Sequence, residues 1–293
     1  MLNAFIEPGI PVLVQGATGR SGRSQTAQMV EYGTNIVAGV SRRDDEQAKL
    51  PLFRNCTEAV SATGARASVA FVPPLDVLPA ILEAIDAGIE LIVTVAEGVP
   101  VHDALKAKAA TREAGIRWVG ASTPGLAIPG KLKMGFLPNV SLAPGSLGVM
   151  SKSGTLSYEV CYRLVERGFG QTLWVGVGGD AVKGVRFADL VPIFAADPAT
   201  QGIVVVGEIG GSEEEELAEA LIASGCKKPV FALLAGRSAL EGVTMGHAGA
   251  LIQANVGTIE TKTAALRKAG AEVSQTIKDL VDMVGATLGH TLV

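Results

Sequence analysis

Residues 11–24 read PVLVQGATGRSGRS and decide the fold of the first half of the chain. The apolar residues 11–15 predict a short buried strand, and the glycine-rich residues 16–22 predict a tight turn into a helix over 24–32. Glycines at such a turn let a diphosphate approach the backbone N–H groups at the helix N-terminus. The stretch therefore predicts a site for an ADP-like diphosphate. A turn whose glycines serve packing only is the alternative.

Strands and helices alternate outward from this stretch. Nearly continuous apolar strands that alternate with helices predict a parallel sheet covered on both faces. The expected strands are 36–40, 67–72, 91–95 and 117–120, and the expected helices are 77–87 and 104–113.

The alternation of strands and helices is interrupted over residues 121–145, where four prolines lie among glycines. Such a stretch predicts a domain boundary. Alternation then restarts, with strands expected at 147–151, 172–177, 203–208, 230–235 and 272–274. We therefore predict an α/β protein with a Rossmann-like domain (1–122), a Pro/Gly-rich connection (123–145) and a flavodoxin-like domain (146–293). Ser212 is expected to cap a helix whose first turn carries the carboxylates of 213–216.

Composition narrows the function classes. Hydrophobic residues make up 48% and charged residues 18%, which excludes disorder and suggests a surface covered by a partner. The net charge is −4 and the sequence shows no basic face, which argues against a nucleic-acid-binding protein. No apolar run reaches the ~18 residues of a membrane span, which argues against a transmembrane helix. Three scattered cysteines and an N-terminus without a signal peptide favour the cytoplasm.

The end of the second predicted strand carries Arg42 and Arg43. In a Rossmann-like domain this is where an adenine ribose lies, and arginines there suit a ribose phosphate. Both NADP and coenzyme A carry such a phosphate, so both ligands stay open. A solvated turn is the alternative.

His247 differs from the other two histidines because it lies in a loop of small residues, MGHAGA at 245–250. An accessible imidazole in such a loop suits a nucleophile better than a packed one. Two strand-end loops are suited to serve it. Ser153, Gly154 and Thr155 open a helix and predict an anion site, and Glu208 is placed to orient a histidine. Together these residues indicate phosphoryl transfer.

The motifs that contain these residues resemble those of the alpha subunit of succinyl-CoA synthetase (succinate–CoA ligase), and the resemblance covers essentially the whole chain. The combination of SKSGTLSYE, VVGEIGGSEEEE and MGHAGALI, in that order, carries most of the specificity. The matching stretches are GATGRSG (16–22), ATGARAS (62–68), LEAIDAGIELIVTVAEGVP (82–100), TPGLAIPGK (123–131), SKSGTLSYE (151–159), GFGQ (168–171), GVGGD (176–180), VVGEIGGSEEEE (205–216) and MGHAGALI (245–252).

The resemblance implies a cycle in which a phosphohistidine carries phosphate between two sites. An ATP-grasp beta subunit holds ATP or GTP with Mg²⁺, and the alpha subunit holds coenzyme A, whose thiol takes the acyl group from an acyl phosphate. No metal ligand is expected in this chain. By resemblance, His247 is phosphorylated, Glu208 is its partner, and Ser153, Gly154 and Thr155 hold the phosphate. Tyr158 matches a residue near the carboxylic acid, and the CoA segments match Thr18, Gly19, Arg20, Ser21, Val95, Ala96 and Glu97.

The departures from the family pattern cluster at the CoA and acid sites. The family's glycine–lysine turn reads VSRRDDEQ here, Ser122 replaces an asparagine, and Ala96 replaces a threonine. We hypothesise that Arg42 or Arg43 takes the place of the lost lysine. A ligase for another acid such as malate is one alternative function. An NADP-dependent oxidoreductase and a non-catalytic CoA-binding scaffold are two others.

Overall fold

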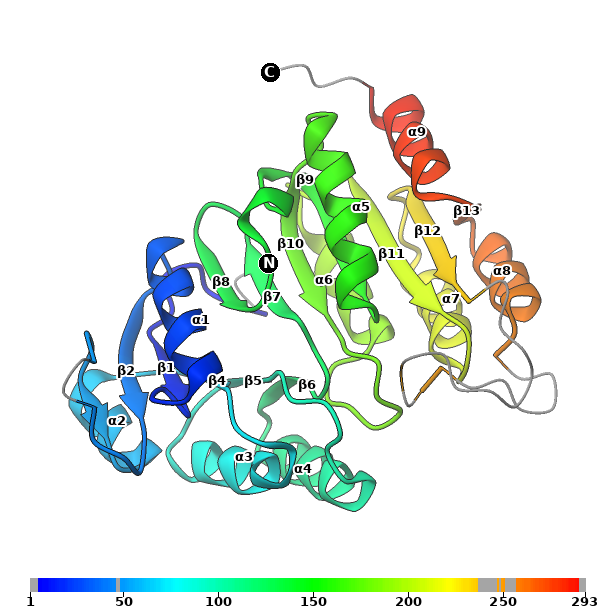
Figure 1. Cartoon of the computed structure of the whole chain (residues 1–293). Helices are drawn as coiled ribbons and strands as arrows, with labels where there is room; N and C mark the ends of the chain where they lie inside the picture. Colours follow the sequence, from blue (N-terminus) through cyan, green and yellow to red (C-terminus); the bar gives the residue numbers. More distant parts are fainter. Residues whose placement is uncertain (1–4, 46–47, 237–246, 248, 251–256, 290–293) are drawn as a thin grey trace.

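The computed structural model describes residues 5–45, 48–236, 247, 249–250 and 257–289. Two sheets organise these residues, and helices pack on both faces of each (Figure 1). The predicted α/β fold is confirmed. The first domain has a Rossmann-like parallel sheet, whereas the sheet of the second domain is mixed.

The first sheet is built around β1 and has six strands in the order β3-β2-β1-β4-β5-β6, all parallel. Helix α1 begins at Arg20, inside the predicted glycine turn and four residues earlier than predicted. The elements are β1 (Val12–Gln15), α1 (Arg20–Glu31), β2 (Ile36–Val40), β3 (Leu52–Phe53), α2 (Cys56–Thr63), β4 (Ala67–Ala70), α3 (Val77–Asp86), β5 (Leu91–Thr94), α4 (Val101–Glu113) and β6 (Arg117–Gly120).

The second sheet has seven strands in the order β13-β12-β11-β9-β10-β7-β8. Strands β9, β10, β11, β12 and β13 are parallel, and the β7–β8 hairpin adds antiparallel strands at one edge. The elements are β7 (Gly125–Ile128), β8 (Leu132–Gly135), β9 (Pro144–Ser151), α5 (Gly154–Glu166), β10 (Gln171–Gly176), α6 (Phe187–Ala196), β11 (Gly202–Glu208), α7 (Glu213–Ser224), β12 (Val230–Ala235), α8 (Ile259–Lys268), β13 (Glu272–Ser274) and α9 (Ile277–Leu288).

The region predicted as a connection, residues 123–145, contains β7 and β8, which the sequence analysis did not foresee. Gly125 and Gly135 face each other across the hairpin at φ of +107° and +124°. A Cβ on Gly125 would lie 1.9 Å from the carbonyl oxygen of Met134, so only glycine permits this close pairing. Residues 125–135 therefore belong structurally to the second sheet.

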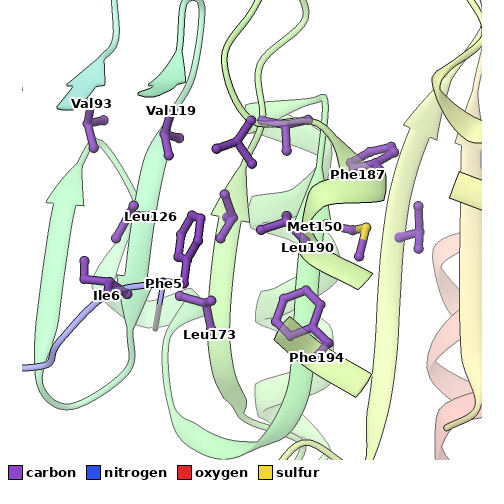
Figure 2. Close-up of a cluster of buried hydrophobic side chains, with 14 of the residues drawn as sticks. Phe5, Ile6, Val93, Val119, Leu126, Met150, Leu173, Phe187, Leu190 and Phe194 are labelled. Carbon is purple, nitrogen blue, oxygen red and sulfur yellow. The ribbon is translucent and has the colours of Figure 1, made fainter. Parts of the chain in front are cut away.

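The core runs from one sheet to the other. Side chains of β5, β6, β7, β10 and α6 form one buried cluster, in which Phe5 and Ile6 lie beside Leu126 and Leu173 (Figure 2). Helices α5 and α9 cover one face of the second sheet, and α6, α7 and α8 cover the other. This shared core fixes the carboxyl edge of the second sheet against the loops of the first domain.

Candidate active site

The site forms where parallel strands β9 and β11 end side by side. The backbone N–H of Lys152, directly after β9, donates to the carbonyl of Val206 in β11 at 3.0 Å. Glu208 is the last residue of β11. The carboxyl ends of neighbouring parallel strands share one edge of a sheet, which is where open α/β sheets hold ligands.

His247 contacts Glu208 directly. Its Nδ1 lies 2.7 Å from Oε2 of Glu208, whose side chain is buried, while the histidine side chain keeps 23% of its surface exposed. A carboxylate at this distance accepts from Nδ1–H and holds the imidazole in the tautomer whose Nε2 has a free lone pair. The hydrogen bond to Glu208 raises the pKa of His247, against the opposing effect of burial.

The loop before α6 makes room for this histidine. The N–H of Gly249 donates to the carbonyl of Gly179 at 3.1 Å, and a Cβ on Gly179 would lie 2.4 Å from the imidazole. Glycine at 179 therefore permits the close approach of His247. The rest of the predicted loop, residues 245–246, 248 and 251–252, lies outside the described residues, as does His290.

A cavity of about 270 Å³ opens beside His247, between the two domains. Glu97 reaches it from the first domain and Asp180 from the loop after β10, and burial raises the pKa of Asp180. The remaining wall is mainly apolar. It consists of Gly98, Val99, Val101, Ala104, Ser122, Ala181 and Val182. The predicted residue Glu97 thus lines the same cavity as His247.

A network of buried ion pairs lies beneath Glu208. Lys152 Nζ is 3.3 Å from Oε1 of Glu214 and 3.9 Å from Oε1 of Glu208. Lys262 binds the other oxygen of Glu214, and Lys183 pairs with Glu213 at 2.6 Å. The first two carboxylates of α7, Glu213 and Glu214, are therefore buried among lysines from three other segments, which the sequence analysis did not predict.

Ser212 lies at the N-cap position of α7, but its hydroxyl donates to Oε1 of Glu216 at 2.7 Å. The predicted capping hydrogen bond is therefore wrong. The hydroxyl is used instead to hold the partly exposed carboxylate of Glu216, which also pairs with Arg186 at 3.0 Å.

The N-terminus of α5 carries the predicted anion-binding residues. Ser153 caps the helix, and its hydroxyl accepts from the N–H of Leu156 at 3.3 Å. Thr155 is exposed. Tyr158 lies one turn further along and packs edge-on against Trp174, with ring centroids 5.9 Å apart, and burial raises its pKa to about 12. Among the described residues no hydrogen bond joins these groups to His247.

A second cavity, of about 570 Å³, follows the glycine turn after β1. Thr18 and Gly19 line it together with Arg42 and Arg43, and the hydroxyl of Thr18 lies 2.7 Å from that of Ser41. The other predicted turn residues are placed differently. Arg20 and Ser21 are exposed and do not line this cavity, while Val95 packs against the core and the carbonyl of Ala96 accepts from Ser122 N–H at 2.9 Å.

Three residues escaped the sequence analysis as site residues. Arg54 lines the second cavity and donates to the carbonyl of Arg42 at 2.7 Å, but no pattern in the sequence marks it. Lys152 and Asp180 were detectable, because each lies in a glycine-containing loop at the end of a strand. Glu208, in contrast, was predicted as a site residue from its position at the end of a strand.

The chain matches the CoA binding domain family over residues 9–98 and the CoA-ligase family over residues 150–272. It is 42% identical over 286 residues to a succinate–CoA ligase [ADP-forming] subunit alpha of Archaeoglobus fulgidus, covering 97% of this chain and 98% of that protein. It is 45% identical over 266 residues to the corresponding subunit of Aquifex aeolicus, covering 89% and 87%. The chain belongs to the succinate–CoA ligase alpha-subunit family.

The chain is also similar to a ligase subunit that is named for a different acid. An ADP-forming sulfoacetate–CoA ligase subunit of Bilophila wadsworthia is 38% identical over 293 residues, covering 98% of this chain and all of that protein. The predicted resemblance is confirmed, and so is the class of enzyme: the alpha subunit of an acid–CoA ligase.

Solved structures agree on the fold. A Methanosaeta concilii ATP citrate lyase solved with citryl-CoA superposes with a TM-score of 0.86 at 25% identity, covering 95% of this chain and 49% of that one. An acetyl-CoA synthetase of Ca. Korarchaeum cryptofilum superposes with a TM-score of 0.79 at 21% identity, covering 98% and 62%. This chain therefore spans about half to three-fifths of those longer polypeptides.

Two negative findings apply to the part of the chain that the structure describes. No helix there has the length and apolar character needed to cross a bilayer. No group of His, Cys, Asp and Glu side chains there is arranged to hold a metal ion.

Proposed function

We propose that His247 carries a phosphoryl group in this acid–CoA ligase, from a nucleoside triphosphate to the carboxylic acid. The 2.7 Å contact between His247 Nδ1 and Glu208 Oε2 is the observation that carries the proposal. With Nδ1–H donated to Glu208, the Nε2 lone pair is the free nucleophile. Nε2 forms a bond to phosphorus while the bond from phosphorus to the donor's bridging oxygen breaks, and the leaving diphosphate keeps that electron pair. The negative charge of Glu208 then stabilises the N-phosphorylated ring.

The N-terminus of α5 supports this proposal, because it offers positive charge to a phosphate. Backbone N–H groups at a helix N-terminus point at a bound anion, and the helix dipole favours negative charge there. We propose that Ser153, Gly154 and Thr155 hold the phosphate, as in the family they match. We also propose that Tyr158 lies near the acid.

The residues of the first domain fit coenzyme A. The turn after β1 packs tightly against the start of α1, since a Cβ on Gly22 would lie 2.1 Å from the carbonyl oxygen of Gly16. A diphosphate can therefore approach the backbone closely, with Thr18, Gly19, Arg20 and Ser21 around it. When bound, coenzyme A supplies the thiol that takes the acyl group. Val95, Ala96 and Glu97 are the proposed second segment of the CoA site.

The ribose phosphate of coenzyme A fits the basic end of the second cavity. Arg42, Arg43 and Arg54 gather there, and Arg54 is held by Arg42 and by Asp44 at 2.6 Å. Guanidinium groups bind phosphate oxygens through paired hydrogen bonds. The arginines thereby take the place of the lysine that the family carries in this turn.

We propose an ATP-grasp beta subunit as the partner that binds ATP or GTP with Mg²⁺, and the cytoplasm as the location. The low charged fraction of 18% fits a buried subunit interface, and the free, buried thiols of Cys56 and Cys161 fit a reducing compartment. The acid we propose is succinate, because relatives at 42% and 45% identity carry that name. Sulfoacetate is the alternative that a relative at 38% identity supports.

The test is formation of acyl-CoA by the chain co-purified with its beta partner. The pair receives ATP, Mg²⁺, coenzyme A and one acid at a time, succinate, malate or sulfoacetate, and the products are identified by mass spectrometry. We expect succinyl-CoA from the pair and no product from the chain alone. Product from another acid only would change the proposed substrate, and full activity of the single chain would refute the partner.

A further inference from the structure

Lys152 lies between two buried carboxylates, on the side of Glu208 away from His247. It follows β9 directly and is 4% exposed, and its Nζ is 3.3 Å from Glu214 and 3.9 Å from Oε1 of Glu208. Oε2 of Glu208 contacts His247, whereas Oε1 has no hydrogen-bond partner among the described residues. The two oxygens of one carboxylate thus face the proposed nucleophile and a buried ammonium group.

Glu214 is shared between Lys152 and a second lysine. Its second oxygen is bound by Lys262, a fully buried lysine that also reaches Glu215 Oε2 at 3.1 Å and the carbonyl of Gly211 at 3.0 Å. Oε1 of Glu214 also accepts from the backbone N–H of Glu208 at 3.0 Å. Glu214 is therefore anchored by Lys262 as well as by Lys152, and it fixes the backbone of Glu208 in return, whereas Lys152 is the cation that the described residues place beside Oε1 of Glu208.

We propose that Lys152 is a positioning residue for phosphorylation of His247. Its ammonium group pairs with Oε1 of Glu208 and leaves Oε2 aimed at His247. The inference rests on the phosphate-carrying role proposed above for His247. It adds a residue that touches neither the phosphate nor the substrates but acts through Glu208.

The cost of removing this charge follows from burial. An isolated buried carboxylate is strongly disfavoured, so it takes up a proton unless a cation or hydrogen bonds support it. A protonated Glu208 cannot stabilise the charged ring of phosphorylated His247. The other charged groups near Lys152 are Glu213 and Glu214 of α7, with Lys183 beyond them, and the charge of Lys152 also lowers the pKa of His247 directly.

The experiment measures the rate of phosphate incorporation into the chain, in complex with its beta partner, as a function of pH. The variants are Lys152→Met, which has similar length and no charge, and Lys152→Arg, which keeps the charge. With Lys152→Met we expect the acid limb of the profile to move to higher pH, so that the rate at pH 6 falls about tenfold while the rate at pH 8 changes little. Lys152→Arg should keep the wild-type profile.

Lys183→Met is the matched control. Lys183 is equally buried and pairs with the same first turn of α7, but its partner is Glu213 at 2.6 Å rather than Glu208. We expect this variant to lose stability while the shape of its pH profile stays that of the wild type. If Lys183→Met moves the acid limb as far as Lys152→Met does, Lys152 has no specific role.

Two further variants complete the test. If Lys152→Met does not fold, Lys152→Gln, which also removes the charge but keeps a polar end that can donate to Glu214, should show the same movement of the acid limb. In a Glu208→Gln background, Lys152→Met should move the limb no further, because the lysine acts through Glu208; a further movement there would be a direct effect of Lys152 on His247 and would overturn the inference. An unshifted profile in the folded variants overturns the inference. A wild-type chain that takes no phosphate overturns the proposed function instead.

Discussion

Replacing Glu208 by glutamine removes the charge that faces His247 and keeps the shape of the side chain. A hydrogen bond to a charged group contributes about 1.5–3 kcal/mol, against about 0.5–1.5 kcal/mol for a neutral one. The difference, about 1–1.5 kcal/mol, corresponds to about tenfold in an equilibrium or a rate. We therefore expect the pKa of His247 to fall toward its ordinary value and its phosphorylation to slow at least tenfold. The slowing is larger if the amide donates to Nδ1, because this stabilises the tautomer with Nε2 blocked by a proton.

The imidazole is titrated by NMR, which is practicable because the chain has only three histidines. Glu97→Gln is the control, since Glu97 also raises the pKa of His247 but only through its charge, and its effect should be smaller. A Glu208→Gln variant with an unchanged His247 pKa and an unchanged phosphorylation rate would refute this reasoning.

The same contact predicts how stability depends on pH. Because the pKa of His247 is raised in the folded protein, its interaction with Glu208 contributes fully below about pH 6.5, the ordinary value for histidine. That contribution is lost as the pH rises through the raised pKa. The difference in unfolding free energy between wild type and Glu208→Gln should therefore shrink over this window.

Three further predictions concern the supporting structure. Gly22→Ala forces a methyl group into the backbone of the first glycine turn, so we expect a loss of about 1–3 kcal/mol in chemical denaturation and weaker CoA binding; unchanged values would show that the turn relaxes freely. Arg42→Ala/Arg43→Ala should weaken CoA binding about tenfold by calorimetry, in line with charge-assisted hydrogen bonds of about 1.5–3 kcal/mol, and unchanged affinity would reject their role. Lys262→Met leaves Glu214 without its buried partner and should cost about 3–5 kcal/mol of unfolding free energy; a loss below about 1 kcal/mol would mean that Lys152 alone neutralises this carboxylate.

Local patterns made the strand-end residues of the site predictable. The glycine turn after β1, the buried strands and the position of Glu208 at the end of β11 follow from apolar runs and glycines within a few residues. His247 stood out because its neighbours are small. The hydrogen bond that joins it to Glu208 connects residues 39 positions apart, and it was predictable only because Glu208 ends a strand and His247 lies in the connection that follows the next strand.

The buried ion network was not predictable, because burial of a charge depends on distant segments. The run of carboxylates at 213–216 indicates a helix start, but not that Glu214 is fully buried against Lys152 and Lys262, which lie 62 and 48 positions away. The β7–β8 hairpin was missed for a different reason. Its prolines and glycines indicate a connection, and only the pairing of β7 with β10 makes these residues part of a sheet.

Direct detection of phosphate on His247 tests the central claim. The chain, co-purified with its beta partner, is incubated with γ-labelled ATP and Mg²⁺, and the label is examined for acid lability and alkali stability, with His247→Ala as the control. We expect label on this chain that is absent from the variant and is discharged by the carboxylic acid together with coenzyme A. An intact wild-type complex that takes up no label, or a His247→Ala complex labelled as fully as the wild type, would contradict the account.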